Sequence, residues 1–388
     1  MKNFHYHMPV DLFFGEGQIA RLAPQMKRFG SKVLLVYGGG SIKRNGLYQK
    51  IMDIFAAEHI SHWELAGVEP NPRLETVVRG VELCREHGIE LILAVGGGSS
   101  IDCAKVVAGS VHYEGSPWDI VMDSSLCKDV LPLGVILTLS ATGSEMDPMA
   151  VITNTERNLK YGVGHPDFIP KFSILDPTYT YTVSASQTAA GTADIMSHVF
   201  ESYFTLHDGA YLINRLAEGI LQTCIHYAPI AMKEPENYEA RANLMWSSSL
   251  AINGLLKNGK TTPWSVHAME HALSAYFDVT HGVGLAILTP VWMEYILNED
   301  TVQMFADYGW NVWQLDRNAE AMSTAKAAIA KTSEFFASLG IPMRLRDLNI
   351  PEDMLEPMAK NAPKGGDTIH GVVPLHWTDV LEIYKRAY

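Results

Sequence analysis

Residues 91–102 read L-I-L-A-V-G-G-G-S-S-I-D, an apolar run that ends in three glycines and continues into polar residues. An apolar run without polar alternation is typical of a strand buried on both faces of a parallel sheet. Residues 33–40, V-L-L-V-Y-G-G-G, repeat the pattern, and a third run at 133–139 precedes S-A-T-G-S at 140–144. We therefore expect three buried strands, each with a turn at its carboxyl end.

The segments between the first two strands have the pattern of amphipathic helices. Residues 47–59 and 72–87 carry apolar residues at helical spacing with charged residues on the opposite face. Alternation of strands and helices predicts an α/β domain with a parallel sheet, to which we assign residues 1–184.

The strand pattern fades beyond this point, and long amphipathic stretches take its place. Ser184 is a candidate helix N-cap, with Gln187 at the third helical position. The amphipathic stretches that follow are residues 210–230, 238–257, 320–339 and 378–387. We assign residues 185–388 to a second, helical domain.

Composition narrows the range of partners. The 388 residues include 43 acidic and 30 basic side chains, a net charge of −13, which argues against nucleic acid or an anionic membrane as partner. The chain has no apolar run long enough for a transmembrane helix and no signal-peptide pattern near its start. Its four cysteines show no C-x-x-C spacing, so we expect reduced thiols and a cytoplasmic protein.

Asp194, His198, His267 and His281 form a candidate metal site. Asp194 and His198 lie four residues apart in G-T-A-D-I-M-S-H, so a helix would present both side chains on one face. One carboxylate and three imidazoles suit Zn or Fe(II), ions that can act as Lewis acids on a substrate oxygen. If the four side chains converge, the protein is an enzyme.

Residues 267–271, H-A-M-E-H, place His271 on the same helical face as His267. Two interpretations of His271 stay open: it relays the substrate proton, or it only orients the metal ligands. The string also matches the H-x-x-E-H motif of inverted zinc proteases, an alternative that leaves the other candidate ligands unexplained. Glu201, three residues after His198, could orient that ligand, but we interpret it as a solvated helix carboxylate.

The two glycine-rich turns are candidate nucleotide-binding loops. Residues 95–102 end a strand and begin a helix, where backbone N–H groups and the helix terminus attract phosphate; the alternative is a simple glycine turn. The loop at 38–44 lacks the acidic residue that grips the ribose 2′-hydroxyl of NAD, and Lys43 and Arg44 lie nearby. This pattern favours NADP, unless Lys43 and Arg44 are only surface residues of a helix start.

Together these motifs resemble the iron-containing (group III) alcohol dehydrogenase family, in particular its NADP-dependent butanol dehydrogenase and aldehyde reductase branch. The resemblance covers nearly the whole chain. The motifs that carry it are F-F-G-E-G at 13–17, Y-G-G-G-S-I-K-R-N-G at 37–46, E-P-N-P at 69–72, G-G-G-S-S-I-D-C-A-K at 96–105, A-T-G-S-E at 141–145, G-x-x-D-x-x-x-H at 191–198 and H-x-x-x-H-x-L-x(7)-H-G from 267.

The resemblance implies a role for each matching residue. The family's metal ligands correspond to Asp194, His198, His267 and His281. Its cofactor-binding positions correspond to Gly38, Gly39, Ser41, Asn71, Gly97, Gly98, Ser99, Asp102, Thr138, Thr142 and Lys160. The implied fold is that of dehydroquinate synthase, an N-terminal dinucleotide-binding domain and a C-terminal helical domain with the site in the cleft between them.

The sequence thus predicts a metal-dependent oxidoreductase that transfers hydride between NADP(H) and a primary alcohol or aldehyde such as butanol or butanal. It leaves Fe2+ and Zn2+ open, and we expect a homodimer. The alternative is a metal- and nicotinamide-dependent lyase or synthase of the dehydroquinate synthase type. The anionic substrate of such an enzyme calls for several basic residues near the metal, whereas Lys260 is the only one between residues 260 and 290. A third class, a non-enzymatic nucleotide-binding protein, would bind no metal.

Overall fold

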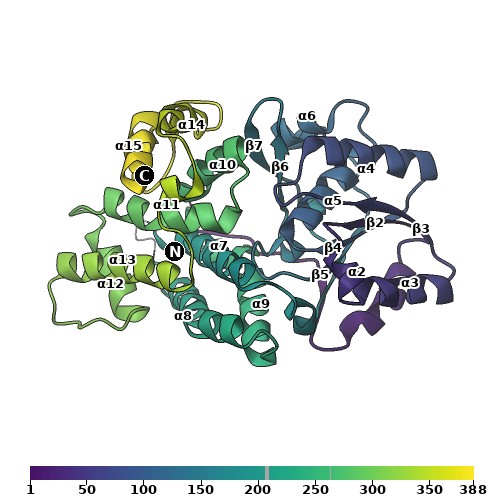
Figure 1. Cartoon of the computed structure of the whole chain (residues 1–388), viewed down its shortest axis with the longest axis horizontal. Helices are drawn as coiled ribbons and strands as arrows, with labels where there is room; N and C mark the ends of the chain where they lie inside the picture. The colour runs from purple at the N-terminus through teal and green to yellow at the C-terminus, as the bar shows by residue number, and fades with distance from the viewer. Residues whose placement is uncertain (206–208, 263) are drawn as a thin grey trace. The chain divides into compact units, whose positions relative to one another are not determined.

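The computed structural model describes residues 1–205, 209–262 and 264–388, which form two compact units. The sheet unit comprises residues His7–Val183 and Pro235–Ser249. The helical unit comprises residues Met1–Tyr6, Ser184–Glu234 and Leu250–Tyr388. Figure 1 follows the chain through both units.

A six-stranded parallel sheet, in the order β1-β8-β5-β4-β2-β3, forms the centre of the sheet unit. Its strands are β1 (Asp11–Phe14), β2 (Lys32–Tyr37), β3 (Ser61–Ala66), β4 (Leu91–Gly96), β5 (Leu133–Leu137) and β8 (Phe172–Leu175). The three apolar runs become β2, β4 and β5, so the expected parallel α/β architecture is confirmed. Every residue of β4 is buried, because helices cover both faces of the sheet.

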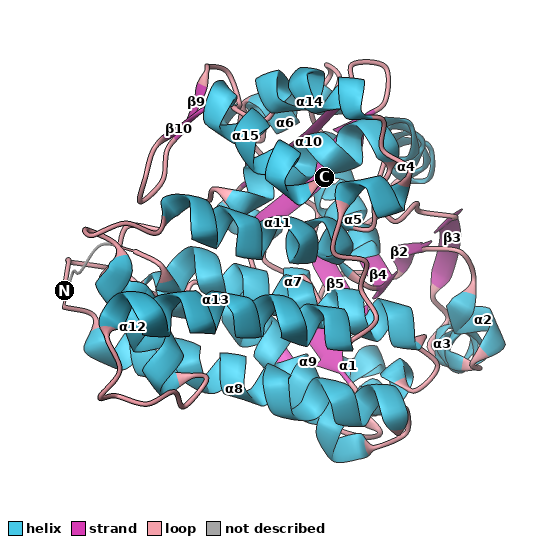
Figure 2. Ribbon diagram, turned by 60° about the vertical axis from the view of Figure 1, so that its left-hand side comes forward, coloured by secondary structure: helices cyan, strands magenta, loops and turns pink. Residues whose placement is uncertain are grey.

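Two separate hydrophobic cores lie on the two faces of this sheet. One face packs against α1 (Leu22–Met26), α2 (Ser41–Arg44) and α3 (Leu47–Ala57). The other packs against α4 (Leu74–His87), α5 (Gly98–Ser110) and α6 (Pro117–Met122). The antiparallel hairpin of β6 (Met149–Asn154) and β7 (Leu159–Gly164) packs on the second core. Figure 2 shows strands β2–β5 and helices α1–α6 from a second direction.

The helical unit is built around α7 (Ala185–Tyr203), which packs against α8 (Tyr211–Lys233) and α11 (His281–Ile296). Ser184 caps α7 as predicted, since its hydroxyl accepts a hydrogen bond from the Gln187 N–H at 3.2 Å. The remaining elements of the helical unit are α10 (Val266–Phe277), α12 (Val302–Asn311), α13 (Ala321–Ser338), α14 (Leu355–Asn361), α15 (Trp377–Ala387), β9 (Thr368–Ile369) and β10 (Leu375–His376).

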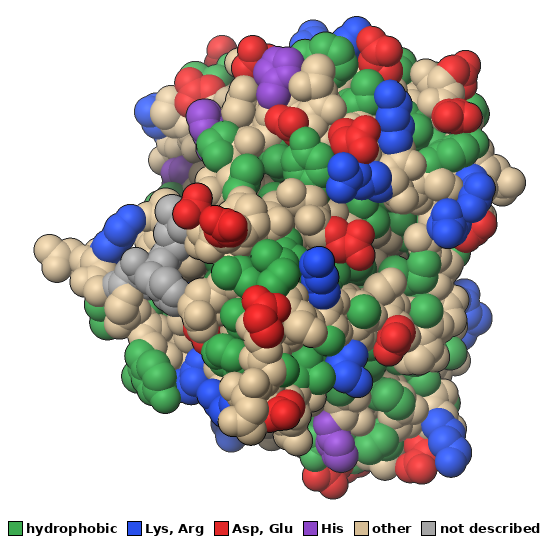
Figure 3. All heavy atoms as spheres, turned by 90° about the vertical axis from the view of Figure 1, so that its left-hand side faces the viewer, with side chains coloured by type: hydrophobic (Ala, Val, Ile, Leu, Met, Phe, Trp, Pro, Cys, Tyr) green, Lys and Arg blue, Asp and Glu red, His purple; other side chains and the backbone are tan. Residues whose placement is uncertain are grey.

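Helix α9 (Tyr238–Ile252) ends five residues before the predicted stretch does, and a short 3-10 turn, Leu255–Lys257, follows it. On the face drawn in Figure 3, acidic and basic side chains are intermixed. Among the described residues, no helix combines the length and apolar character needed to cross a membrane.

Candidate active site

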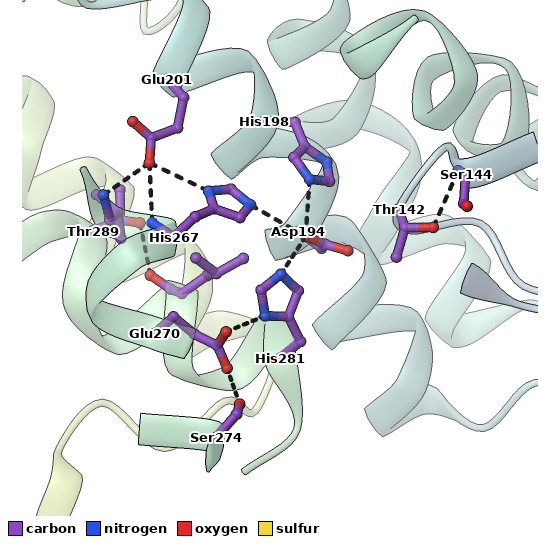
Figure 4. A network of polar contacts seen from close by, with 12 residues as sticks. Thr142, Ser144, Asp194, His198, Glu201, His267, Glu270, Ser274, His281 and Thr289 are labelled. Atoms are coloured by element: carbon purple, nitrogen blue, oxygen red, sulfur yellow. Dashed lines mark hydrogen bonds and ion pairs between the residues drawn. The ribbon is translucent and has the colours of Figure 1, made fainter. Parts of the chain in front are cut away.

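Three helices of the helical unit supply the candidate metal ligands. Helix α7 carries Asp194 and His198 one turn apart, and α10 carries His267 in its first turn. His281 is the first residue of α11. Figure 4 shows the three imidazoles arranged around the Asp194 carboxylate.

The ligand atoms converge on one oxygen. Asp194 Oδ1 lies 3.7 Å from His198 Nε2, 4.0 Å from His267 Nε2 and 3.6 Å from His281 Nε2. The ligand atoms of Asp194, His267 and His281 all lie within 4.8 Å of one another. His198 is outside that triad but stacks on His267, with ring centroids 4.8 Å apart and planes 17° apart.

These distances fit a divalent ion. Ligand atoms that each lie about 2.1 Å from one ion are roughly 3–4 Å apart, depending on the angle at the ion. The buried Nε2 of His267 has no hydrogen-bond partner among the residues that the structure describes. Burial, followed by the charges of His267 and His281, holds the pKa of His198 well below its usual range, so its imidazole is neutral, the form that binds metal.

Glu201, on the next turn of α7, is not the solvated carboxylate that we expected. Glu201 is buried, with only 2 % of its surface exposed. It accepts hydrogen bonds from the backbone N–H groups of Ser265, Val266 and His267 at 2.9, 2.8 and 3.1 Å. Its Oε1 also lies 3.2 Å from His267 Nδ1, so Glu201 contacts His267 rather than His198.

Glu270 is a site residue that the sequence analysis missed. It is fully buried on α10 and contacts His281 Nδ1 and the Ser274 hydroxyl. Its residue type and position were visible in H-A-M-E-H, but only as part of the protease motif. The general base of a protease would face the ion's water, whereas Glu270 is bound to a histidine from the neighbouring helix.

His271 and Trp264 lie beside the candidate ligands. The ring of His271 is 6.3 Å from that of His267 and 5.7 Å from that of His281, centroid to centroid. Ligand atoms of Glu270, His271 and His281 also come within 4.8 Å of one another, so both interpretations of His271 stay open. Trp264 packs edge-on against His267 and His198, with centroid distances of 4.8 and 5.8 Å.

In the sheet unit, the predicted phosphate loop is the junction of β4 and α5. Gly97 is the N-cap residue of α5, and Gly98 is its first residue. A side chain at Gly98 would overlap Thr142, whose Cβ would lie 2.8 Å from the added carbon. The glycine therefore lets this junction pack directly on the segment that follows β5.

Other predicted cofactor residues gather at the same ends of β4 and β5. The Thr138 N–H donates to the Gly96 carbonyl at 2.9 Å, and the Ser99 hydroxyl donates to the carbonyl of Pro70, the residue before buried Asn71. Lys160 is buried on β7 opposite Thr153, whose N–H donates to the Pro72 carbonyl at 2.8 Å. The lysine is thus close in the fold to the E-P-N-P segment.

Asp102 is engaged within the protein. Its carboxylate accepts from the Ser144 hydroxyl at 2.6 Å and from the Val151 N–H at 2.9 Å. Burial raises the pKa of Asp102 to about 6. The fully buried Lys105 donates to Ser144 at 2.8 Å and to Asp147 at 2.7 Å. These bonds connect α5 to the loop between β5 and β6, so Asp102 has a structural role whether or not it also touches a nucleotide.

The second glycine loop follows β2, and a carboxylate lies near it. Gly38 and Gly39 precede Ser41, the first residue of α2. Lys43 Nζ is 3.4 Å from the carboxylate of Glu64, on the neighbouring strand β3. Two tyrosines surround this pair: the hydroxyls of Tyr37 and Tyr48 donate to Glu64, and Lys43 Nζ lies 5.1 and 4.5 Å from their ring centroids.

In the helical unit the candidate metal ligands converge, and in the sheet unit a glycine-rich loop lies at the ends of parallel strands. Candidate sites of these two kinds are typical of metal- and nicotinamide-dependent enzymes. Two family profiles agree with this class: iron-containing alcohol dehydrogenase matches residues 9–177, and the C-terminal domain of the Fe-containing alcohol dehydrogenase family matches residues 188–388. The chain belongs to the iron-containing alcohol dehydrogenase family, and its function is the metal-dependent oxidation of alcohols or reduction of aldehydes. The lyase alternative is not favoured.

Individual relatives match along their full length. NADH-dependent butanol dehydrogenase A of Clostridium acetobutylicum is 58% identical over 389 residues, 100% of each chain. The NADPH-dependent aldehyde reductase YqhD of Escherichia coli is 38% identical over 393 residues, 100% of this chain and 99% of the other. The crystal structure of NADH-dependent butanol dehydrogenase A from Thermotoga maritima has a TM-score of 0.95 at 36% identity, covering 100% of this chain and 99% of that one.

Proposed function

We propose that this protein interconverts small primary alcohols and aldehydes of the butanol and butanal type. In this proposal Asp194, His198, His267 and His281 hold one divalent ion, Fe2+ or Zn2+. The observation that carries the proposal is the convergence of three imidazole Nε2 atoms, from α7, α10 and α11, on Asp194 Oδ1. The names of the relatives support the substrate class.

The chain's residues would divide the work of hydride transfer. A bound divalent ion supplies Lewis acidity toward the substrate oxygen. Histidines bind metal as neutral imidazoles, so with the Asp194 carboxylate the four ligands would carry one negative charge and leave a divalent site with net positive charge. Trp264, packed on two of the imidazoles, keeps water from that side of the ligands. His271 would carry the hydroxyl proton between substrate and solvent through its ring nitrogens.

In this proposal, the β4–α5 junction binds the pyrophosphate of the nicotinamide cofactor. Gly97, Gly98 and Ser99 would present backbone N–H groups there, at a helix N-terminus. Thr138 and Thr142 would face the nicotinamide side, with Asn71, Asp102 and Lys160 as the remaining contacts. Gly38, Gly39 and Ser41 would line the adenosine ribose.

We further propose that NADH is the preferred cofactor, in contrast to the preference for NADP that the sequence pattern suggested. The charge of Lys43 is already paired with Glu64, a carboxylate that the sequence pattern did not reveal. A 2′-phosphate would be repelled by Glu64 and attracted by Lys43, so the net gain over a hydroxyl is small. Relatives at 58% identity are named NADH-dependent, whereas YqhD, named NADPH-dependent, is 38% identical.

An absorbance assay at 340 nm tests both parts of the proposal. Butanal and a series of shorter and longer aldehydes are reduced with NADH or NADPH by protein that was stripped of metal and then supplied with Fe2+ or Zn2+. We expect turnover only with added metal, and higher kcat/KM with NADH than with NADPH. Turnover that is independent of metal would overturn the metal assignment, and a clear preference for NADPH would overturn the cofactor assignment.

A further inference from the structure

We propose that Glu201 and Glu270 are positioning residues that orient the imidazoles of His267 and His281 toward a shared ion. The proposal rests on the metal site of the proposed function and adds two residues to it. Each glutamate contacts the Nδ1 atom of one histidine, while the Nε2 atom of that histidine faces Asp194. Figure 4 shows the two carboxylates on the far sides of the two rings.

The contacts of Glu201 indicate which ring nitrogen of His267 carries the proton. Its carboxylate already accepts three backbone N–H bonds, from Ser265, Val266 and His267. A carboxylate with these donors acts as an acceptor, so the Nδ1 of His267 must be the protonated nitrogen. The Nε2 lone pair of His267 is then free to bind metal, as in the carboxylate–histidine–metal arrangements of other proteins.

Glu201 also holds the helix on which His267 lies. The first N–H groups of a helix have no acceptor within the helix, and Ser265, the N-cap residue of α10, makes no side-chain cap. Glu201 on α7 takes that place. One carboxylate therefore fixes both the start of α10 and the ring orientation of His267, which lies two residues after the N-cap.

Glu270, which is fully buried, orients the ring of His281 in the same way. Its carboxylate contacts His281 Nδ1 on one side and the hydroxyl of Ser274 on the other. Gly284, one turn after His281, leaves room for it, since a side chain there would come within 2.8 Å of Glu270 Cγ. Glu270 thereby links α10 to the first turn of α11.

His198 is held differently. Its Nδ1 is buried and has no hydrogen-bond partner within the described part of the chain. Its ring instead packs against the rings of His267 and Trp264. We therefore expect that two of the three imidazoles owe their tautomer to a carboxylate, whereas the third depends on packing.

Metal affinity of Glu201→Gln and Glu270→Gln tests the proposal. Glutamine keeps the size and the carbonyl acceptor but halves the acceptor capacity and adds an N–H2 donor. Loss of such a partner typically weakens metal binding about 10- to 100-fold. Zn2+ and Co2+ affinities are measured by chelator competition, and the d–d absorption of the Co2+ protein reports the ligand geometry. We expect both variants to bind more weakly and to show shifted Co2+ bands.

A control variant and a measurement of melting temperature distinguish a positioning role from a general loss of stability. Glu218→Gln removes another buried glutamate, which accepts from Tyr203 at 2.7 Å and from Asn311 at 3.0 Å, and should leave metal affinity unchanged. The melting temperature of the metal-free protein should fall for Glu201→Ala, which also removes the α10 cap, and should change little for Glu270→Gln. Wild-type affinity and an unchanged Co2+ spectrum in both glutamine variants would overturn the proposal. A wild-type protein that binds neither ion would instead overturn the proposed function.

Discussion

At the scale of single residues, His271 is the group whose two interpretations make opposite predictions. If it relays the substrate proton, His271→Ala should lower kcat by about 10²-fold or more, because general acid–base groups typically contribute that much. Metal content, measured by atomic emission, should stay at the wild-type level. Loss of metal together with activity would instead make His271 a support of the ligands. Kinetics and metal analysis on the same preparation distinguish the two.

Glu64 is the residue at which the cofactor proposal is most directly tested. The hydroxyls of Tyr37 and Tyr48 donate to different oxygens of Glu64, so Glu64→Gln keeps an acceptor for one of them. The substitution leaves the charge of Lys43 without its acidic partner. We expect the ratio of kcat/KM for NADPH to that for NADH to rise about tenfold, which corresponds to ~1.4 kcal/mol. Lys43→Met should shift the ratio in the opposite direction. An unchanged ratio in both variants would show that this pair lies away from the ribose.

The raised pKa of the buried Glu145 predicts how the stability of the protein depends on pH. Burial raises the pKa of this carboxyl to about 7, against an ordinary value of 4.5, and it accepts from the Ser249 hydroxyl. The folded state therefore holds the proton more tightly than the unfolded state. The contribution of Glu145 to the free energy of unfolding is complete below about pH 4.5. As the pH rises from there to about pH 7, this contribution falls by up to ~1.4 kcal/mol per pH unit.

Replacing Glu145 by glutamine should remove this contribution to the pH dependence. The amide keeps the acceptor for Ser249 and cannot ionise, so the variant should be the more stable protein above pH 7, by up to about 3 kcal/mol. Urea unfolding of both proteins at pH 5, 6, 7 and 8 measures the difference. A difference that does not grow between pH 5 and 7 would contradict the raised pKa.

The residues of the proposed metal site differ in how far the sequence could indicate them. Asp194 and His198 were visible because their side-chain types and their spacing of four on one helix already suggest ligation. Glu201 and Glu270 were not, because their role depends on which helix lies opposite. A glutamate on an amphipathic helix is usually solvated, and only the packing of α10 on α7 makes Glu201 a buried acceptor. Glu64 was missed for the same reason, since it belongs to a neighbouring strand.

At the scale of elements, the contact of α11 with α7 decides where His281 lies. Gly282 begins this contact: a side chain there would come within 2.6 Å of the Ala190 carbonyl carbon. Gly282→Ala must therefore push the first turn of α11 away from α7 and carry His281 with it. We expect metal affinity to fall at least ~10-fold and stability to fall by about 1–3 kcal/mol.

Gly219 provides the matched control for this substitution. It lies in the exposed face of α8, with no atom within 4 Å of an added side chain. Gly219→Ala should raise stability by about 0.5–1 kcal/mol, since alanine favours the helix over glycine. Chelator competition and thermal unfolding on both variants give the comparison. Wild-type metal affinity in Gly282→Ala would mean that α11 can shift without moving His281.

Among the elements, those whose local pattern is strong were predicted well, and the others were not. Continuous apolar runs identified β2, β4 and β5, and Ser184 identified the start of α7. Strand β3, S-H-W-E-L-A, lies at the edge of the sheet, where one of its sides pairs with no other strand of the described residues. It has too few apolar residues to be recognised from the sequence. The sequence pattern assigns helix α9 to the helical domain, yet its Met245 packs into a core of the sheet unit. This packing depends on tertiary contacts, which leave no local pattern in the sequence.

At the scale of the whole molecule, each compact unit carries one of the two proposed ligands. The proposed metal ligands all lie in the helical unit, and the proposed nucleotide loops all lie in the sheet unit. A ligand that binds only the folded state stabilises it by RT ln(1 + [L]/Kd), about 2.7 kcal/mol at a concentration of 100 Kd. If the units open separately, each ligand should protect mainly its own unit.

Hydrogen exchange measured by mass spectrometry tests this division of the molecule. At 100 times Kd, Zn2+ should slow exchange up to about 100-fold in peptides of α7 and of the first turns of α10 and α11. NADH should slow exchange in peptides from the β4–α5 junction and from residues 138–144 instead. At the same Zn2+ concentration the Gly282→Ala protein should show a weaker response to Zn2+ and an unchanged response to NADH, because its altered contact lies in the helical unit. Equal protection of both units by Zn2+ alone would contradict independent opening, since a ligand can spread its stabilisation over the whole chain only when the units unfold as one.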